Sequence, residues 1–264
     1  MMQATNLQEL PTQLGIAKKV WAVASGKGGV GKTWFSITFA HALGRKGIRT
    51  LLFDADFGLA NVDVQLGLNP SRDLGGVLSG EYRLDAAAIA FDGGFDVIAG
   101  RSGSGSLASM SAERLDRMET ALSGVADRYD RIILDLGAGI ERTVRLLAAR
   151  SAVCIVMTTD EPTALTDAYA FLKLGYMSQP GADFRIVVNM AGSEAEGLRT
   201  YGTLRKACET FLKKTPELAG VVRRDEKVRD AIRHQSPLLT RHPGSKAARD
   251  VERIADRFAP SMRP

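Results

Sequence analysis

The sequence predicts an α/β fold, a mostly parallel sheet flanked by helices on both faces. Short apolar runs recur along the chain, segments with helical periodicity separate most of them, and polar motifs follow directly after several runs. This alternation is typical of parallel sheets, in which ligand-binding loops lie at the carboxyl ends of the strands. We expect buried strands at residues 20–25, 49–54, 95–99, 130–135, 152–158, 184–189 and 218–222.

A phosphate-binding loop follows the first predicted strand. Residues 26–33 match the pattern G-x-x-x-x-G-K-[ST], and the apolar face of a helix follows at Phe35, Phe39 and Leu43. Glycines allow a tight turn, so that backbone N–H groups converge on phosphate oxygens at the positive end of the helix. The sequence therefore predicts a single-domain P-loop NTPase. The residues expected to bind the nucleotide in this loop are Gly26, Lys27, Gly28, Gly29, Val30, Gly31, Lys32 and Thr33.

Acidic residues lie at the ends of two other predicted strands, Asp54 and Asp56 at or just after the end of the second and Asp135 at the end of the fourth. In loops of this kind the lysine, here Lys32, reaches the β- and γ-phosphates, and the hydroxyl, here Thr33, coordinates Mg²⁺. We expect ATP and Mg²⁺ as cofactors, with Thr33, Asp56 and Asp135 on the metal side. Asp56 is the candidate for orienting the attacking water. The alternative for Asp54 and Asp56 is that their carboxylates only cap the following turn.

The remaining elements carry fewer chemical signals. Asn189 ends the sixth predicted strand, and its side chain has both a donor and an acceptor, which suits an adenine edge. An ordinary asparagine that starts a turn is the alternative. Pro162 begins a helix that runs to about Gly175, and Ser193 caps another. Residues 100–109 are rich in glycine and serine, and we expect them to form a mobile loop.

Bulk properties favour one large soluble domain. The chain has 264 residues, of which 45% are apolar, and it has no apolar run of the ~20 residues that cross a bilayer. Its beginning lacks the features of a secretory signal, so we expect a cytosolic protein. From Arg199 onward there are 16 Lys and Arg against 8 Asp and Glu. This basic excess indicates either a surface for nucleic acid or anionic lipid, or a solvated basic face.

The motifs together resemble a known family. Lys27 gives the phosphate-binding loop the deviant Walker A form. With residues 54–61 and 135–139, it makes the chain resemble the MinD/ParA-type ATPases over nearly its whole length. The segments most similar to the FlhG/FleN branch, which limits flagellar number and position, are residues 58–63 and 161–170.

The resemblance implies a dimerisation cycle. In the family the signature lysine, here Lys27, reaches across a dimer to the partner's nucleotide, so that ATP joins two subunits and hydrolysis releases them. Lys27, Lys32 and Asp56 are then the catalytic residues of a spatial-regulation ATPase. Its expected location is the cytoplasm, peripherally at the inner membrane or cell pole. We expect residues 1–17 to be a flexible N-terminal segment and residues 18–264 to form the ATPase domain.

The N-terminal segment partly matches a second family motif. FlhG proteins often begin with a segment that stimulates the GTPase FlhF. Residues 2–8 agree with it at Gln3, Ala4 and Leu7, whereas two charged positions of the motif are uncharged here. The segment is therefore either a contact for an FlhF-type GTPase or an N-terminus without this function.

Two features of the last quarter depart from the family. Arg223 replaces a proline of the family's late G-x-I-P-x-D element, which leaves the geometry on the adenine side open. Relatives also close with an amphipathic membrane helix. Here the helix of residues 245–258 has only a modest apolar stripe of Ala247, Val251 and Ile254, continued at Phe258, that suits ordinary packing against the sheet equally well.

Three other functions remain alternatives. A ParA-type partition or cargo-positioning ATPase would bind the DNA backbone without sequence preference. A metabolic ATP-dependent enzyme would need a second polar constellation, and none is evident in the sequence. A nucleotide-gated scaffold would hydrolyse ATP negligibly. The basic residues expected to bind DNA under the first alternative are Arg223, Arg224, Arg229, Arg233 and Arg241.

Overall fold

A central sheet organises the computed structural model, which describes residues 18–56, 58–100 and 112–259. The described residues form eight strands in the order β3-β4-β2-β5-β1-β6-β7-β8. All neighbouring strands are parallel except β3 and β4. The strands are β1 (Val20–Ser25), β2 (Thr50–Ala55), β3 (Ile89–Phe91), β4 (Phe95–Ile98), β5 (Arg131–Ala138), β6 (Val153–Thr158), β7 (Phe184–Ala191) and β8 (Glu217–Arg223).

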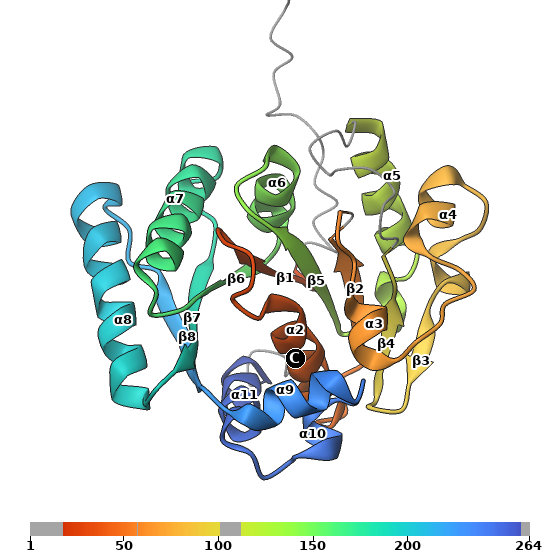
Figure 1. Ribbon diagram of the computed structural model, residues 1–264. Helices are drawn as coiled ribbons and strands as arrows, with labels where there is room; N and C mark the ends of the chain where they lie inside the picture. The colour runs from red at the N-terminus through yellow and green to blue at the C-terminus, as the bar shows by residue number, and fades with distance from the viewer. Residues whose placement is uncertain (1–17, 57, 101–111, 260–264) are drawn as a thin grey trace, which may run out of the picture.

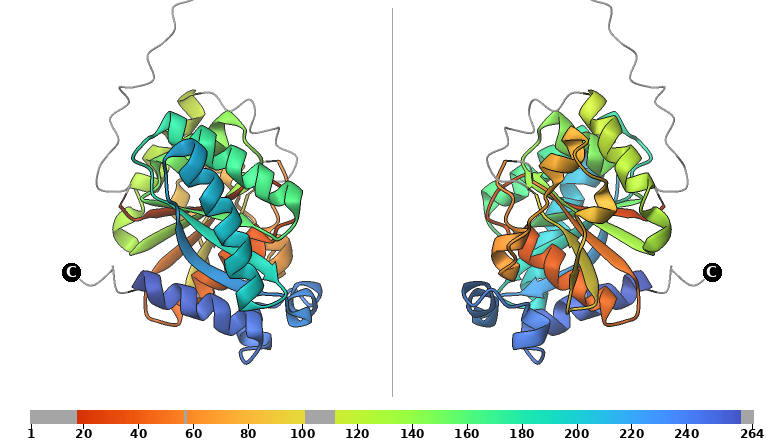
Figure 2. Two further views of the ribbon diagram at one scale, coloured as in Figure 1. Left: turned by 90° about the vertical axis from the view of Figure 1, so that its left-hand side faces the viewer. Right: turned by 90° about the vertical axis from the view of Figure 1, so that its right-hand side faces the viewer.

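Helices cover both faces of the sheet (Figures 1 and 2). One face packs against α4 (Leu74–Ser79), α5 (Ala112–Ser123), α6 (Arg142–Arg150), α7 (Pro162–Ser178) and α8 (Glu194–Ala207). The other packs against α2 (Lys32–Gly44), α3 (Val62–Leu66), α9 (Glu226–Arg233), α10 (Leu238–Arg241) and α11 (Lys246–Phe258). The predicted α/β fold class is therefore confirmed. None of the described helices is both long and apolar enough to cross a membrane.

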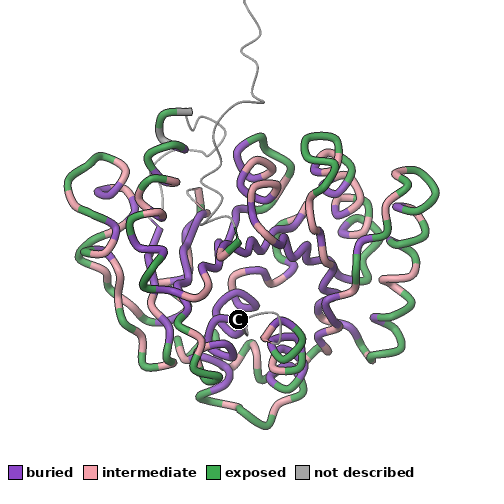
Figure 3. The backbone as a smooth tube through the Cα atoms, turned by 180° about the vertical axis from the view of Figure 1, so that it is seen from behind, coloured by how far each residue is buried: buried purple, intermediate pink, exposed green. Residues whose placement is uncertain are grey.

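Side chains of the central strands enter two separate cores. In β1, Val20, Ala22 and Ala24 pack on one face, whereas Trp21 and Val23 pack on the other. This alternation follows from the two-residue period of a strand, and burial of both faces explains why the strand reads as a continuous apolar run. Figure 3 shows the result as a buried centre between outer helices with exposed faces.

The seven predicted strands are all present, and the structure adds one. The sequence analysis missed β3, a three-residue antiparallel strand at the edge of the sheet. Its side chains are only partly buried, so it lacks the apolar signal of the other strands. The predicted mobile loop at residues 100–109 lies almost entirely outside the described residues.

The predicted helix signals are also present. Pro162 is in the first turn of α7, which runs beyond Gly175 to Ser178. The side chain of Ser193 accepts a hydrogen bond from the backbone of Glu196 and so caps α8, and a π-helical turn, Cys208–Leu212, follows α8.

The apolar stripe of α11 is buried. Ala247, Val251, Ile254 and Phe258 are each at most 2% exposed, and α11 packs on β8 and α2. The packing interpretation of this helix therefore holds, and its stripe is not presented to a membrane in this structure.

Candidate active site

The P-loop joins β1 to α2 at the carboxyl edge of the sheet. Gly29 and Gly31 have φ values of 79° and 88°, in the left-handed region that glycine adopts without strain. Gly31 is the N-cap of α2 and has no side chain to cap the free N–H groups of the first turn. These N–H groups and the helix dipole favour an anion at this position.

Two glycines of the loop are required for close packing. A Cβ atom on Gly26 would lie 2.1 Å from the backbone oxygen of Asp167 in α7. A Cβ atom on Gly31 would lie 2.5 Å from the Asn189 Nδ2 atom. A Cβ on Gly29 would meet nothing within 4 Å, which leaves room beside the loop. The loop is thus held by α7 and β7 and open at Gly29.

Lys32 and Asp135 bring opposite charges together beneath the loop. Both side chains are almost fully buried. Burial lowers the pKa of Lys32, an effect that the nearby Asp135 and Asp56 carboxylates oppose. Burial likewise raises the pKa of Asp135 to about 6, opposed by the hydroxyl of Thr33, by Lys32 and by the hydroxyl of Ser36. The Ser36 Oγ atom donates a 2.9 Å hydrogen bond to Asp135 Oδ1.

This donor set fits the predicted cofactors, ATP and Mg²⁺. The Thr33 hydroxyl lowers the pKa of the Asp135 carboxyl group, so the two groups lie near each other, and both are oxygen ligands of the kind that Mg²⁺ takes. Lys32 supplies a cation for phosphate at the same place. The sequence analysis gave Ser36 no role, although it lies three residues after Thr33, nearly one helical turn further along α2.

Asp54 caps the turn that follows β2. Its carboxylate accepts hydrogen bonds from the backbone of Asp56 at 3.1 Å, Asn61 at 3.0 Å and Val62 at 3.1 Å. Burial and the neighbouring Asp135 raise the pKa of Asp54 to about 7, and these three N–H groups oppose the rise. The capping alternative therefore describes Asp54, and Asp56 caps the same turn with one of its two carboxylate oxygens.

Asp56 is less buried and lies next to the same charges. Its Oδ1 atom accepts from the backbone of Gly58 at 3.2 Å and of Leu59 at 3.0 Å. Among the described residues no hydrogen bond involves its Oδ2 atom, which is therefore the oxygen left for a water molecule. The carboxylate contributes to the field at both Lys32 and Asp135, so the structure brings these predicted residues together.

Lys27 is bound to the first turn of α7. Its Nζ atom donates to Glu161 Oε2 at 2.6 Å and to Thr163 Oγ1 at 2.8 Å. The hydrogen bond from Lys27 lowers the pKa of Glu161. The sequence analysis used Glu161 and Thr163 only as part of the family resemblance and did not predict that they bind Lys27.

Asn189 contacts the loop itself. Its side chain is buried, and the Nδ2 atom donates a 2.8 Å hydrogen bond to the backbone oxygen of Val30. The adenine contact expected from the sequence stays a prediction, because this hydrogen bond uses one N–H group and leaves the amide oxygen and the other N–H group for a base.

Arg223 forms an internal ion pair. Its backbone N–H, Nε and Nη2 all donate to the buried Asp250 carboxylate, at 2.9, 2.9 and 2.8 Å. Arg241 likewise pairs with Asp230, at 2.6 Å. Both arginines are among the residues that would bind DNA under the first alternative; the Arg223 guanidinium is engaged with a buried carboxylate, whereas the Arg241 pair is exposed, and the DNA contact stays a prediction. Arg224, Arg229 and Arg233 remain exposed.

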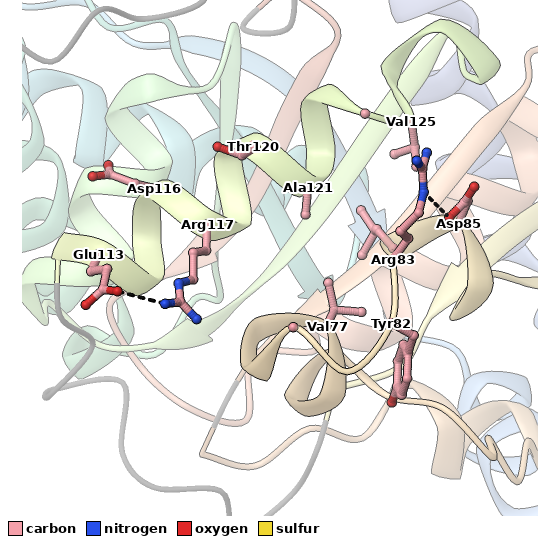
Figure 4. Close-up of a pocket in the computed structure, with 13 residues that line it drawn as sticks. Val77, Tyr82, Arg83, Asp85, Glu113, Asp116, Arg117, Thr120, Ala121 and Val125 are labelled. Atoms are coloured by element: carbon pink, nitrogen blue, oxygen red, sulfur yellow. Dashed lines mark hydrogen bonds and ion pairs between the residues drawn. The ribbon is translucent and has the colours of Figure 1, made fainter.

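A groove of about 630 Å³ lies between α4 and α5, and none of the predicted site residues lines it (Figure 4). Its apolar lining includes Val77 and Val125. Several of its charged side chains pair with each other, Arg83 with Asp85 at 3.2 Å and Arg117 with Glu113 at 2.8 Å. These four charged side chains are therefore paired with one another within the groove.

Comparison with known families agrees with this geometry. Residues 21–238 match the family described as the CobQ/CobB/MinD/ParA nucleotide binding domain, which covers most of the chain and spans every predicted site residue. The chain belongs to this family. The resemblance to MinD/ParA-type ATPases is therefore confirmed, and the P-loop of this chain is that of a nucleotide-binding domain.

Similar sequences in the family include flagellar proteins. The antiactivator FleN of Pseudomonas aeruginosa is 37% identical over 239 residues, which cover 90% of this chain and 85% of FleN. The flagellum site-determining protein YlxH of Helicobacter pylori is 32% identical over 239 residues, covering 90% of this chain and 80% of YlxH. These matches agree with the predicted FlhG/FleN branch.

Solved structures of the family share the fold. The cell division ATPase MinD of Pyrococcus furiosus has a TM-score of 0.75 at 22% identity, covering 92% of this chain and 99% of that one. MinD of Pyrococcus horikoshii, solved as a complex with Mg-ADP, has a TM-score of 0.74 at 22% identity, covering 93% and 99%.

Proposed function

We propose that this protein is a Mg²⁺-dependent ATPase whose ATP-bound dimer acts as a spatial switch controlling the number or placement of flagella. The observation that carries the proposal is the convergence of Lys32, Thr33 and Asp135 beneath the P-loop. Similarity to FleN and YlxH over about 90% of the chain supports the flagellar role.

The residues of the chain divide the work of hydrolysis. Backbone N–H groups of the loop and the start of α2 bind the phosphates, and Lys32 offsets their charge. Thr33 and Asp135 would hold Mg²⁺, with Ser36 keeping the carboxylate in place through its 2.9 Å hydrogen bond. When bound, Mg-ATP supplies the electrophilic phosphorus and the leaving group. Burial of Lys32 and Asp135 strengthens these electrostatic interactions because water is excluded.

Asp56 is proposed to orient the attacking water through its Oδ2 atom. Its other oxygen is tied to Gly58 and Leu59, and Asp54 fixes the backbone of Asp56 itself. The carboxylate is therefore held by the loop that it caps, which is the positional control that water activation requires.

Dimerisation would require Lys27 to change partners. In the proposed dimer Lys27 contacts the nucleotide of the other subunit, as the family resemblance implies. Here its Nζ atom is bound to Glu161 and Thr163 of the same chain. We therefore assign the present arrangement to a free subunit, in which Lys27 is held by its own chain. Formation of the dimer would release Lys27 from Glu161 and Thr163.

The proposed partners follow from the same resemblance. An FlhF-type GTPase would contact residues 2–8, which lie outside the described residues, and the protein would act from the cytoplasm at the inner membrane or cell pole. The FlhF contact and the membrane attachment are parts of the proposal to be tested separately.

A second candidate function is DNA-dependent cargo positioning. The exposed Arg224, Arg229 and Arg233 near and on α9 favour it, together with the basic excess of the last quarter. The ion pair of Arg223 with the buried Asp250 leaves less of its charge for phosphate groups.

One experiment distinguishes the two functions. The protein is sedimented with anionic liposomes and, separately, with duplex DNA, each in Mg-ATP and in Mg-ADP, while phosphate release is measured in parallel. ATP-dependent binding to liposomes supports the flagellar switch at a membrane. ATP-dependent, salt-sensitive binding to DNA alone supports the second function. Absence of phosphate release under all conditions contradicts the ATPase assignment and leaves a nucleotide-gated scaffold.

A further inference from the structure

The end of β7 is joined directly to the phosphate-binding loop. Asn189, which is 3% exposed, donates from Nδ2 to the backbone oxygen of Val30 at 2.8 Å. Val30 is followed by Gly31, which is the N-cap of α2 and has a φ of 88°. The contact therefore fixes the peptide just before the turn on which the direction of the loop's N–H groups depends.

The backbone next to this contact departs from regular strand geometry. Met190, the next residue, has a φ of 56°, an unfavourable value for a side chain of this kind. The pairing of β7 with β8 is irregular between Val188 and Ala191, on either side of the same residue. Strained backbone of this type persists where surrounding structure over-determines it, and it concentrates at functional sites.

The fit between Asn189 and the loop is close. A Cβ atom on Gly31 would lie 2.5 Å from Nδ2 of Asn189 and 3.5 Å from Cε of Met190. Within the described part of the chain, no other hydrogen bond of the Asn189 side chain is present. Its amide oxygen and second N–H group are therefore left for the base that the sequence analysis assigns to it.

We propose that Asn189 is a positioning residue that braces the phosphate-binding loop from the end of β7 and thereby links the base-binding and phosphate-binding parts of the site. One N–H group holds the loop through Val30, and the rest of the amide is presented to the base. The proposal rests on the proposed nucleotide binding and adds that the brace acts on phosphate affinity even when no base is present.

The test uses a ligand without a base. Binding of Mg-ATP and of Mg-tripolyphosphate is measured by calorimetry for the wild type and for Asn189→Leu, which keeps similar volume and removes the donor. If Asn189 braces the loop, both ligands should bind more weakly to the variant, by roughly 5- to 30-fold. The reason is that the backbone carbonyl of Val30 loses its hydrogen-bond donor and the loop is no longer held in place. Amide exchange at residues 30–33 should rise without ligand.

A matched control separates the brace from general destabilisation. Thr158 is a buried polar residue at the end of the adjacent strand β6, paired with Val188, and its hydroxyl bonds only to Thr159 among the described residues. Thr158→Val should leave tripolyphosphate affinity and exchange at residues 30–33 as in the wild type. If Asn189→Leu does not fold, Asn189→Ala replaces it in the same comparison.

The outcomes are distinct. If Asn189→Leu loses affinity for Mg-ATP but binds tripolyphosphate as the wild type does, Asn189 only reads the base and the brace is overturned. Equal losses in Asn189→Leu and Thr158→Val also overturn it. If the wild type binds neither ligand, the proposed function fails instead.

Discussion

Lys27 and Glu161 form an ion pair of 2.6 Å between the phosphate-binding loop and the first turn of α7. The lysine is the residue that the family resemblance places across a dimer, yet here it is bound within its own subunit. Their side chains are 36% and 62% exposed, so the pair is accessible to water and contributes little to stability. A contact of this strength is compatible with opening during the nucleotide cycle.

Removing the lysine should separate binding from dimerisation. Lys27→Ala is expected to abolish ATP-dependent dimers and hydrolysis, because the cross-subunit contact is lost. Nucleotide binding should remain measurable, since Lys32 still serves the phosphates. Light scattering and calorimetry check the two expectations, and an ATP-dependent dimer in this variant would show that Lys27 has no cross-subunit role.

Weakening the ion pair between Lys27 and Glu161 should favour the dimer. Glu161→Gln removes the charge that holds Lys27, and exposed ion pairs are worth about 0–1 kcal/mol, so the dimer dissociation constant in Mg-ATP should fall by up to roughly fivefold. Asp130→Asn is the matched control, because it breaks another exposed pair, with Arg49, away from the loop. Sedimentation velocity measures both. A weaker dimer in Glu161→Gln would contradict the proposal that Glu161 holds Lys27 in the free subunit.

The two site carboxylates should fail in different ways. Asp56→Ala is expected to bind ATP, accumulate as a dimer and lose at least about 100-fold in turnover, because the water loses its orientation. Asp135→Ala should instead weaken Mg²⁺-dependent binding. Asp56→Asn serves as a control for the loop, since its amide oxygen can still accept from Gly58 and Leu59. Near-wild-type turnover in either alanine variant rules out the role of that residue.

Restoring the family's proline should destabilise this chain. Arg223→Pro removes three hydrogen bonds to Asp250, one of them from the backbone, and leaves a buried carboxylate with Arg253 as its remaining charged partner. The free energy of unfolding should fall by about 2–3 kcal/mol in chemical denaturation. Arg223→Met, which keeps the backbone N–H, should lose less. Equal stability of Arg223→Pro and the wild type would show that the ion pair is dispensable.

The same ion pair predicts a pH dependence. Burial acts to raise the pKa of Asp250, but hydrogen bonds from Arg223 and Arg253 outweigh it and hold the pKa below its usual value. The resulting stability is present above the unfolded-state pKa of about 3.9 and is lost as the pH falls through the lower folded-state pKa. Asp250→Asn should therefore flatten the acid limb of the stability curve, and an unchanged acid limb would remove Asp250 as its source.

Deleting the N-terminal segment tests the partner proposal. A chain lacking residues 1–14 should keep its ATPase activity and dimerisation, because the P-loop and the described sheet begin after them. It should lose stimulation of an FlhF-type GTPase and alter flagellar number in cells. Full stimulation by the truncated chain would make the similarity of residues 2–8 accidental, whereas loss of its own ATPase activity would make the segment structural.

The sequence by itself determined the fold class and the phosphate-binding loop. Seven strands read as apolar runs because both faces of the sheet are buried, and residues 26–33 form a contiguous motif whose chemistry is local. Asp135 could also be identified from the sequence, because it ends an apolar strand at the edge where parallel sheets place their ligand-binding loops. Features encoded within a few neighbouring residues are those that a sequence pattern reports.

The tertiary structure decided which distant groups meet. Lys27 and Glu161 are 134 residues apart, and Asn189 and Val30 are 159 apart, so no periodicity relates them. Arg223 looked like a free cation because Asp250, its partner from α11, lies 27 residues away on another element. The burial and pairing of charged side chains depend on which surfaces the sheet brings together. For this reason only the tertiary structure decided which charged side chains are paired and which are free.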